Sequence, residues 1–156
     1  MAAVKPIPEG YPQVTPYLAV QGGAAAIDFY TDVLGATERV RMPGPGGTIG
    51  HAELQLGDSM IMLADETPQF GNRSPKTIGG TPVTIGVYVE DVDAVFERAL
   101  KAGATQIRPV ENQFYGDRTG LFEDPFGHRW SVATHIEDVS PEEMQRRAAE
   151  MMGGAG

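Results

Sequence analysis

The sequence predicts an α+β fold built from two similar modules, each with one strand, one helix and three further strands. The segment TPYLAV and a following amphipathic helix that ends in LGA return 69 residues later as TIGVYV, a second amphipathic helix and AGA. When Thr15 is aligned with Thr84, the two predicted strands align without a gap. Gly35 and Gly103, which end the two helices, then align after a shift of one residue. Such a repeat indicates two copies of one supersecondary unit.

Proline, glycine and polar residues divide the chain into five segments. We expect an extended N-terminal arm at residues 1–13, a first module at 14–65, a linker or flap at 66–82, a second module at 83–138, and a C-terminal helix and tail at 139–156.

In the first module, alternation predicts a strand at residues 14–20, followed by a helix with an apolar stripe at helical spacing. The stripe comprises Ala26, Ile27, Tyr30, Val33 and Leu34. Gly35 is expected to end this helix as its C-cap. Three strands should follow at 38–42, 48–56 and 59–64, the last two joined by the turn pair Gly57-Asp58.

The second module repeats this order. Asp91 is expected to cap a helix that Gly103 closes, with apolar residues at i, i+3, i+4, i+7 and i+8. These residues are Val92, Val95, Phe96, Ala99 and Leu100. Strands should follow at 106–110, 119–123 and 129–135, with a turn at 124–127. The capping box that starts at Ser140 predicts a last helix to about residue 152.

Composition narrows the possible functions. The 156 residues, 41% of them hydrophobic, are enough for a sizeable core, and the lack of cysteine excludes disulfides and thiolate chemistry. The formal charge of -9 repels phosphate backbones and anionic lipids, so neither nucleic acid nor a membrane is expected as a partner. No apolar run approaches the roughly 18 residues of a membrane span, and residues 1–12 lack a signal-peptide core, so we expect a cytoplasmic protein.

Five motifs in a fixed order support a family resemblance. They are TPYLAV, IDFYTDVLGA, HAELQLGDSMIML, QFYGDRTGLFEDPFGHRW and THIEDVSPEEM. With the repeated modules, they resemble the vicinal oxygen chelate superfamily of glyoxalase I, extradiol dioxygenases and bleomycin-resistance proteins, and within it the PhnB-like branch. The match spans roughly residues 14–145.

The resemblance implies paired, curved, mixed four-stranded sheets with their helices outside and a shared pocket between the modules. Period-two alternation then assigns the residues of each strand to a face. In HAELQL, the helix side receives Ala52, Leu54 and Leu56, and the pocket side receives His51, Glu53 and Gln55. The first strands should place Thr15, Tyr17, Thr84 and Tyr88 on the pocket side.

The superfamily's metal enzymes, as the resemblance implies, use a histidine early in the first strand and a carboxylate late in the fourth strand of each module. These positions here read Thr15, Thr84 and Ser131, and the remaining one falls within residues 60–64, where no acid occurs. Hydroxyl and thioether groups do not replace imidazole and carboxylate as ligands of a divalent metal. We therefore expect no metal and no cofactor.

The three histidines have different expected roles. His51 and Glu53 lie at i and i+2 of a strand, about 7 Å apart on one face, and can share a ligand or form an acid/base pair. The alternative for His51 is a half-buried polar group that a neighbour satisfies. His128 is expected in turn chemistry, His135 in a loop contact, and Trp130 in the core.

The segment 114–118 is a candidate loop over the ligand. Tyr115 would offer a flat apolar face with a hydroxyl, and Arg118 a bidentate clamp for a carboxylate or phosphonate. The alternative is that Asp117 and Arg118 pair with the other module.

The candidate ligand-binding residues are therefore Thr15, Tyr17, His51, Glu53, Thr84, Tyr88, Tyr115, Arg118 and Ser131. Three functions remain open. One is a glyoxalase/bleomycin-resistance-like protein that binds a small organic molecule without a metal. The second is a lyase, isomerase or dioxygenase-like enzyme that uses His51 and Glu53 as acid and base, or an unusual metal. The third is a structural module. The resemblance also implies a homodimer.

Overall fold

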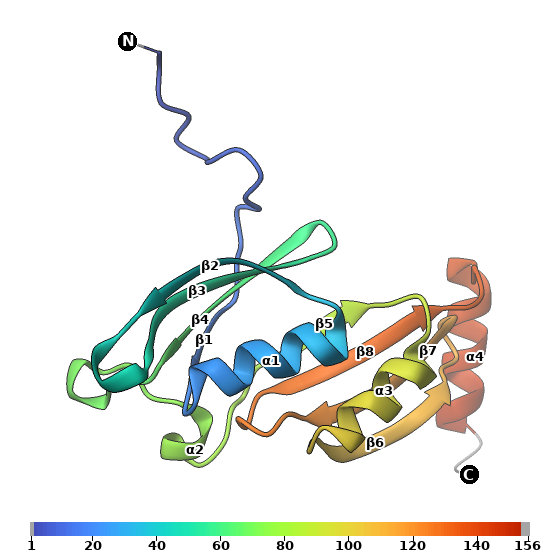
Figure 1. Ribbon diagram of the computed structural model, residues 1–156. Helices are drawn as coiled ribbons and strands as arrows, with labels where there is room; N and C mark the ends of the chain where they lie inside the picture. The colour runs from blue at the N-terminus through green and yellow to red at the C-terminus, as the bar shows by residue number, and fades with distance from the viewer. Residues whose placement is uncertain (1, 154–156) are drawn as a thin grey trace. The chain divides into compact units, whose positions relative to one another are not determined.

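The computed structural model describes residues 2–153 of the chain, which forms two compact units, Met1–Thr81 and Pro82–Gly156. We refer to these units as module 1 and module 2. Each contains a four-stranded sheet and a helix packed on one face of that sheet (Figure 1). The predicted α+β fold of two repeated modules is confirmed. Within residues 2–153, no helix combines the length and apolar composition needed to cross a bilayer.

Module 1 contains four strands and one long helix, with three short helical turns. Its elements are β1 (Tyr17–Val20), α1 (Gly23–Leu34), β2 (Thr37–Pro43), η1 (Pro45–Gly47), β3 (Ile49–Leu56), β4 (Ser59–Asp65), η2 (Pro68–Phe70) and α2 (Pro75–Ile78). The sheet order is β1-β4-β3-β2, with β1 parallel to β4 and the other neighbours antiparallel. Gly35 caps α1 in the left-handed conformation, as predicted, and its amide donates to the carbonyl of Tyr30.

Module 2 repeats this plan. Its elements are β5 (Thr84–Tyr88), α3 (Val92–Lys101), β6 (Thr105–Asn112), β7 (Asp117–Glu123), β8 (Arg129–His135) and α4 (Pro141–Gly153). The sheet order β5-β8-β7-β6 matches that of module 1, strand for strand. Asp91 caps α3 and Ser140 caps the first turn of α4, as predicted.

Some boundaries differ from the sequence predictions. The first strand begins at Tyr17 rather than at residue 14, because Pro16 lacks an amide hydrogen for the ladder. Ala102 is the C-cap of α3, and Gly103 follows it with a φ of 104°. Leu100, predicted on the buried face of this helix, is 37% exposed.

Glu66 organises the segment 66–82. Its carboxylate accepts hydrogen bonds from the amide of Ser74 and the hydroxyl of Thr77, at 2.8 and 2.7 Å. The side-chain amide of Gln21 also donates to this carboxylate, at 2.8 Å. The Ser74 amide is the main cause that lowers the pKa of Glu66 to about 2. This carboxylate holds the turn that leads into α2.

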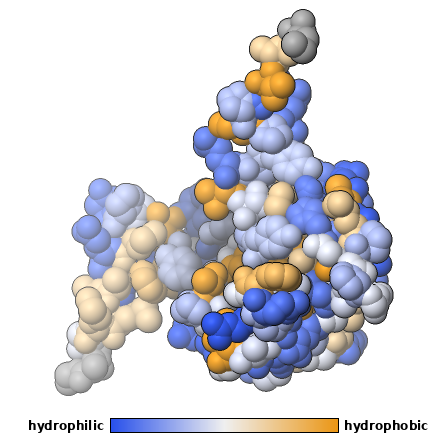
Figure 2. All heavy atoms as spheres, turned by 90° about the vertical axis from the view of Figure 1, so that its left-hand side faces the viewer, coloured by the Kyte–Doolittle hydropathy of each residue, from blue (hydrophilic) through white to orange (hydrophobic). Residues whose placement is uncertain are grey.

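Residues 2–16 precede β1 without a helix or strand, and apolar side chains lie exposed along this part of the chain (Figure 2). Val4 is 90% exposed, whereas Tyr11 contacts module 1 through a hydrogen bond to Glu53. Through Tyr11, the arm therefore makes a polar contact with Glu53 that the sequence analysis did not anticipate.

The core of module 2 depends on one buried carboxylate. Asp124, in the turn before β8, accepts hydrogen bonds at 2.9 Å from the amides of Phe126 and His128 and from the indole nitrogen of Trp130. Trp130 is fully buried, as predicted, and β8 then alternates between the core and the opposite face of the sheet.

The packing of α3 on β7 requires a glycine at position 120. A Cβ atom there would lie 2.7 Å from Cε2 of Phe96 and 2.8 Å from Cγ2 of Val110. Gly86, in β5 of the same sheet, has no such neighbour within 4 Å and no positive φ.

We expect Gly120→Ala to lower the free energy of unfolding by about 1–3 kcal/mol, because the added methyl group overpacks the contact between α3 and β7. Gly86→Ala is the matched control and should leave stability unchanged or raise it by about 0.4–1 kcal/mol. Urea unfolding of both variants measures the difference. Equal losses in the two variants would contradict this account of the packing.

Candidate functional site

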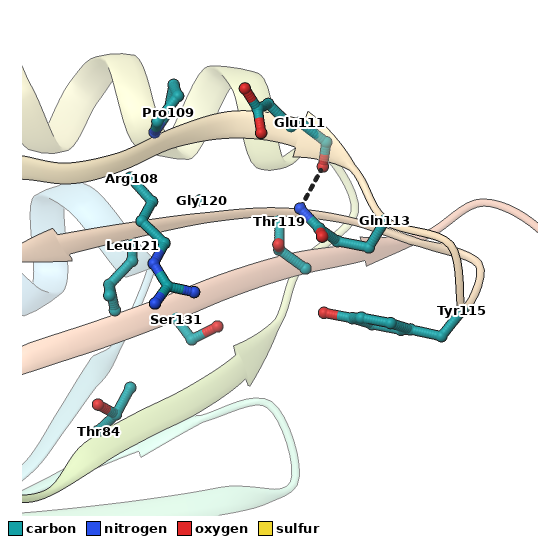
Figure 3. A pocket seen from close by; sticks show the side chains of 10 residues that line it. All are labelled: Thr84, Arg108, Pro109, Glu111, Gln113, Tyr115, Thr119, Gly120, Leu121 and Ser131. Atoms are coloured by element: carbon teal, nitrogen blue, oxygen red, sulfur yellow. Dashed lines mark hydrogen bonds between the residues drawn. The ribbon is translucent and has the colours of Figure 1, made fainter. Parts of the chain in front are cut away.

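A cavity of about 310 Å³ lies in module 2, on the face of the sheet away from α3 (Figure 3). All of its lining residues belong to module 2 and come from the four strands and the loop between β6 and β7. They are Thr84, Arg108, Pro109, Glu111, Gln113, Tyr115, Thr119, Gly120, Leu121 and Ser131.

Three of the predicted site residues line this cavity. Thr84 of β5 and Ser131 of β8 place hydroxyl groups in it, and Tyr115 extends its ring from the loop at the rim (Figure 3). Ser131 faces the cavity because its neighbours Trp130 and Val132 are fully buried on the helix side. Sequence alternation therefore placed these strand residues on the correct face.

Arg108 is a cavity residue that the sequence analysis missed. The register of β6 with β7 shifts between Gln106 and Arg108, and again between Arg108 and Glu111. Each shift adds one residue to β6, so strict alternation fails along this strand. Arg108 consequently pairs with Leu121 and points its guanidinium into the cavity (Figure 3).

Arg118 does not line the cavity, which corrects the prediction that it clamps a ligand there. Its neighbour Thr119 lines the cavity, and successive side chains of a strand point to opposite faces, so Arg118 lies on the α3 side of β7. Its Nε and Nη2 atoms donate to the two carboxylate oxygens of Asp93 at 2.8 and 2.9 Å. The hydrogen bond to Asp93 raises the pKa of Arg118 and lowers that of Asp93. Arg118 therefore pairs within module 2.

Tyr88 and Asp117 join His135 in a second polar cluster of module 2. Asp117 is 7% exposed. Its carboxylate accepts a hydrogen bond from the hydroxyl of Tyr88 at 2.7 Å and lies 2.7 Å from Nδ1 of His135. Nε2 of His135 lies 2.7 Å from the carboxylate of Asp138. Both ring nitrogens thus face carboxylates, and a doubly protonated imidazole satisfies both contacts.

These contacts shift the protonation of the cluster. Hydrogen bonds to Asp138, and then to Asp117, raise the pKa of His135. Burial alone would raise the pKa of Asp117, but the hydrogen bonds from His135 and Tyr88 outweigh it and lower the pKa. The hydrogen bond to Asp117 raises the pKa of Tyr88. The predicted loop contact of His135 is therefore a charged one, and Tyr88 belongs to this cluster.

Module 1 contains a cluster around the predicted pair of His51 and Glu53. The hydroxyl of Tyr17 lies 2.7 Å from Nδ1 of His51, and Nε2 of His51 lies 3.6 Å from the carboxylate of Glu53. Glu53 is 6% exposed and accepts the hydroxyl of Tyr11 at 2.9 Å. The structure thus brings Tyr17, His51 and Glu53 together, whereas Thr15 precedes β1 and is not part of the cluster.

The pKa values of both tyrosines of this cluster are raised. The hydrogen bond to Glu53 is the main cause that raises the pKa of Tyr11. Burial, and then the charge of Glu53, raise the pKa of Tyr17. The Tyr17 hydroxyl and Nδ1 of His51 share one hydrogen bond, and the tautomer of His51 sets which of the two atoms donates. No periodic pattern surrounds Tyr11 in the sequence, so no signal pointed to its role.

Comparison with known proteins identifies the family. The model of the Glyoxalase/Bleomycin resistance protein/Dioxygenase superfamily matches residues 11–132. The chain belongs to this superfamily. An uncharacterised protein of Mycobacterium bovis is 47% identical over 137 residues, which cover 86% of this chain and 90% of that protein. An uncharacterised protein of Mycobacterium tuberculosis is also 47% identical over 137 residues, which cover 86% of this chain and 81% of that protein.

Solved structures share the fold. TioX from Micromonospora sp. ML1 is 28% identical with a TM-score of 0.63, covering 80% of this chain and 99% of TioX. PA1353 from Pseudomonas aeruginosa is 26% identical with a TM-score of 0.64, covering 81% of this chain and 99% of that one. A PhnB protein from Bacillus cereus, described as a putative 3-demethylubiquinone-9 3-methyltransferase, has a TM-score of 0.62 and covers 79% of this chain and 99% of its own. At 19% identity, it shows the fold alone.

The residues at the superfamily's metal positions do not fit a divalent metal. Thr84 and Ser131 offer hydroxyl groups in the module 2 cavity, and Met62 lies opposite Tyr17 in module 1. These groups do not replace imidazole and carboxylate ligands. Across residues 2–153, no three His, Asp or Glu side chains form a group that could hold a metal ion.

The His135 cluster should make stability depend on pH. Because the folded-state pKa is raised, the stabilisation is fully present below the ordinary histidine pKa of about 6.5 and is lost as pH rises through the folded value. Urea midpoints of the wild type should thus fall from pH 6 towards pH 9, and His135→Gln should flatten this fall. His128→Gln, in the turn before β8, is the control and should keep the wild-type slope. An unchanged slope in His135→Gln would exclude the cluster as its source.

Proposed function

We propose that this protein binds a small organic molecule in the module 2 cavity without the superfamily metal. The main support is the cavity itself, because its volume of about 310 Å³ and its mixture of apolar and hydrogen-bonding groups suit a small ligand. Leu121 and Pro109 offer apolar surface, and the ring of Tyr115 closes one side. The hydroxyls of Thr84 and Ser131 stand where metal enzymes of the superfamily would need ligands, which favours binding over metal-assisted chemistry.

A second candidate function is acid/base catalysis in module 1. It is favoured by the contacts of Tyr17 and Glu53 with the two ring nitrogens of His51, at 2.7 and 3.6 Å. His51 could accept a proton from a bound substrate, and Glu53 would stabilise the resulting imidazolium. Proton transfers in lyase and isomerase reactions can use such a pair.

Three finer assignments stay predictions. The five sequence motifs support the PhnB-like branch. A homodimer and a cytoplasmic location follow from the resemblance and the composition, respectively.

The binding proposal can be tested with ¹H–¹⁵N correlation spectra recorded during titration with a fragment library of small aromatic molecules. We expect hits to shift the amide signals of cavity residues such as Thr119 and Ser131. Tyr115→Ala should weaken these hits by about tenfold, because the ring wall is lost. Phe70→Ala, which removes an exposed aromatic ring in module 1, should change nothing. A library without a single hit on the cavity residues would refute the proposal.

The second candidate predicts a particular tautomer of His51. Since the carboxylate of Glu53 only accepts, neutral His51 should hold its proton on Nε2, towards Glu53, and accept the Tyr17 hydroxyl at Nδ1. Long-range ¹H–¹⁵N spectra of the imidazole detect the tautomer directly. Tyr17→Phe should shift the Nδ1 signal, because that nitrogen loses its donor. Finding the proton on Nδ1 would remove the basis for this acid/base pair.

A further inference from the structure

We propose that the module 2 cavity recognises an oxyanion, a carboxylate or phosphonate on an aromatic or apolar body, and that Arg108 binds this group. The inference rests on the proposed function of the cavity and names the class of its ligand. It assigns the cation of the site to Arg108 on β6, in place of Arg118 on β7.

Arg108 reaches the cavity only because β6 is bulged. Gln106 pairs with the buried Phe122, and a regular strand would place Arg108 on that same helix side. The extra residue between Gln106 and Arg108 reverses the phase. Bulges commonly redirect one side chain next to a binding site, and here the redirected side chain is a cation that points into the module 2 cavity (Figure 3).

The guanidinium of Arg108 has no protein partner among residues 2–153. Other arginines of module 2 are engaged: Arg118 with Asp93, Arg129 with Glu123, and Arg147 with Glu137. In a chain with 21 acidic and 12 basic residues, carboxylates to neutralise a cation are abundant. An arginine that pairs with none of them, and lines a cavity, has its five donors available to a ligand.

The surroundings of Arg108 suit an oxyanion with an apolar body. Hydroxyls of Ser131 and Thr84 lie on the same side of the cavity as its guanidinium (Figure 3) and can donate to anionic oxygens. Tyr115 and Leu121 offer surface to a ring. Glu111 is the acidic side chain of the lining, and its carboxylate points away from the cavity (Figure 3). A planar guanidinium binds carboxylate and phosphonate groups through two parallel hydrogen bonds.

The test uses matched probes: aryl carboxylic acids, the corresponding aryl phosphonic acids, and the neutral aryl carboxamides. Titrations followed by ¹H–¹⁵N spectra give the dissociation constant of each probe at the cavity residues. We expect the acids to bind at least about tenfold more tightly than the carboxamides, and Arg108→Gln to abolish this preference. Arg108→Lys keeps the charge but loses the planar fork of donors, so it should bind both kinds of acid more weakly than the wild type does, while keeping part of their advantage over the carboxamides.

Arg118→Gln is the matched control, since it changes the same residue type on the neighbouring strand but on the opposite face. It should keep the preference for acids, while losing stability with its Asp93 pair. Arg108→Gln should keep the wild-type urea midpoint, because its side chain is exposed and unpaired.

The possible failures are distinguishable. If carboxamides bind at the cavity as tightly as the acids, or Arg108→Gln keeps the preference, the oxyanion inference is overturned and the binding function stands. If Arg118→Gln removes the preference instead, the assignment to Arg108 is overturned. If no probe of the three sets shifts the cavity residues, the proposed function fails, and the inference fails with it.

Discussion

The hydrogen bonds of the Asp124 carboxylate determine how module 2 presents its site. This buried carboxylate accepts two amides of its own turn and the indole of Trp130. A buried charge is stable only when hydrogen bonds replace its water, and here three donors do so. The turn is thereby closed and Trp130 is fixed in the core. Since strand residues alternate, fixing Trp130 inward also fixes Ser131 outward, into the cavity.

The two modules use one backbone plan to present different chemistry. In both, a helix covers one face of a four-stranded sheet, and the other face is left for polar groups. Module 1 presents the titratable groups of Tyr17, His51 and Glu53, in contact with one another. Module 2 presents hydroxyls, a tyrosine ring and an unpaired guanidinium around a cavity. We propose ligand binding for the second sheet, whereas the first sheet contains the candidate acid/base pair.

Much of the fold could be predicted from the sequence, because local signals agree with one another. The repeat, the Asp91 and Ser140 caps and the Gly35 C-cap each identify an element, and β8 occupies the expected residues 129–135. Alternation also places Thr84 and Ser131 correctly, because β5 and β8 are regular and pair without a shift. Where strands are regular, period two is sufficient to assign their faces.

The parts that could not be predicted depend on irregular backbone or on distant contacts. Two register shifts in β6 break alternation, so no sequence pattern identifies Arg108 as the arginine of the cavity. Arg118 follows an aromatic loop and resembles a ligand clamp in sequence, yet the phase of β7 directs it to Asp93 on α3. Tyr11 contacts Glu53 across 42 residues of chain, from an arm without periodic structure.

The most direct measurement is a crystal structure of the protein grown with a saturating aryl carboxylate that shifts the cavity signals. We expect the carboxylate in bidentate contact with Arg108 and the ring against Tyr115, within module 2. A carboxylate bound elsewhere, such as beside His51 on module 1, or a ligand in the cavity whose carboxylate points away from Arg108, would contradict the central claim.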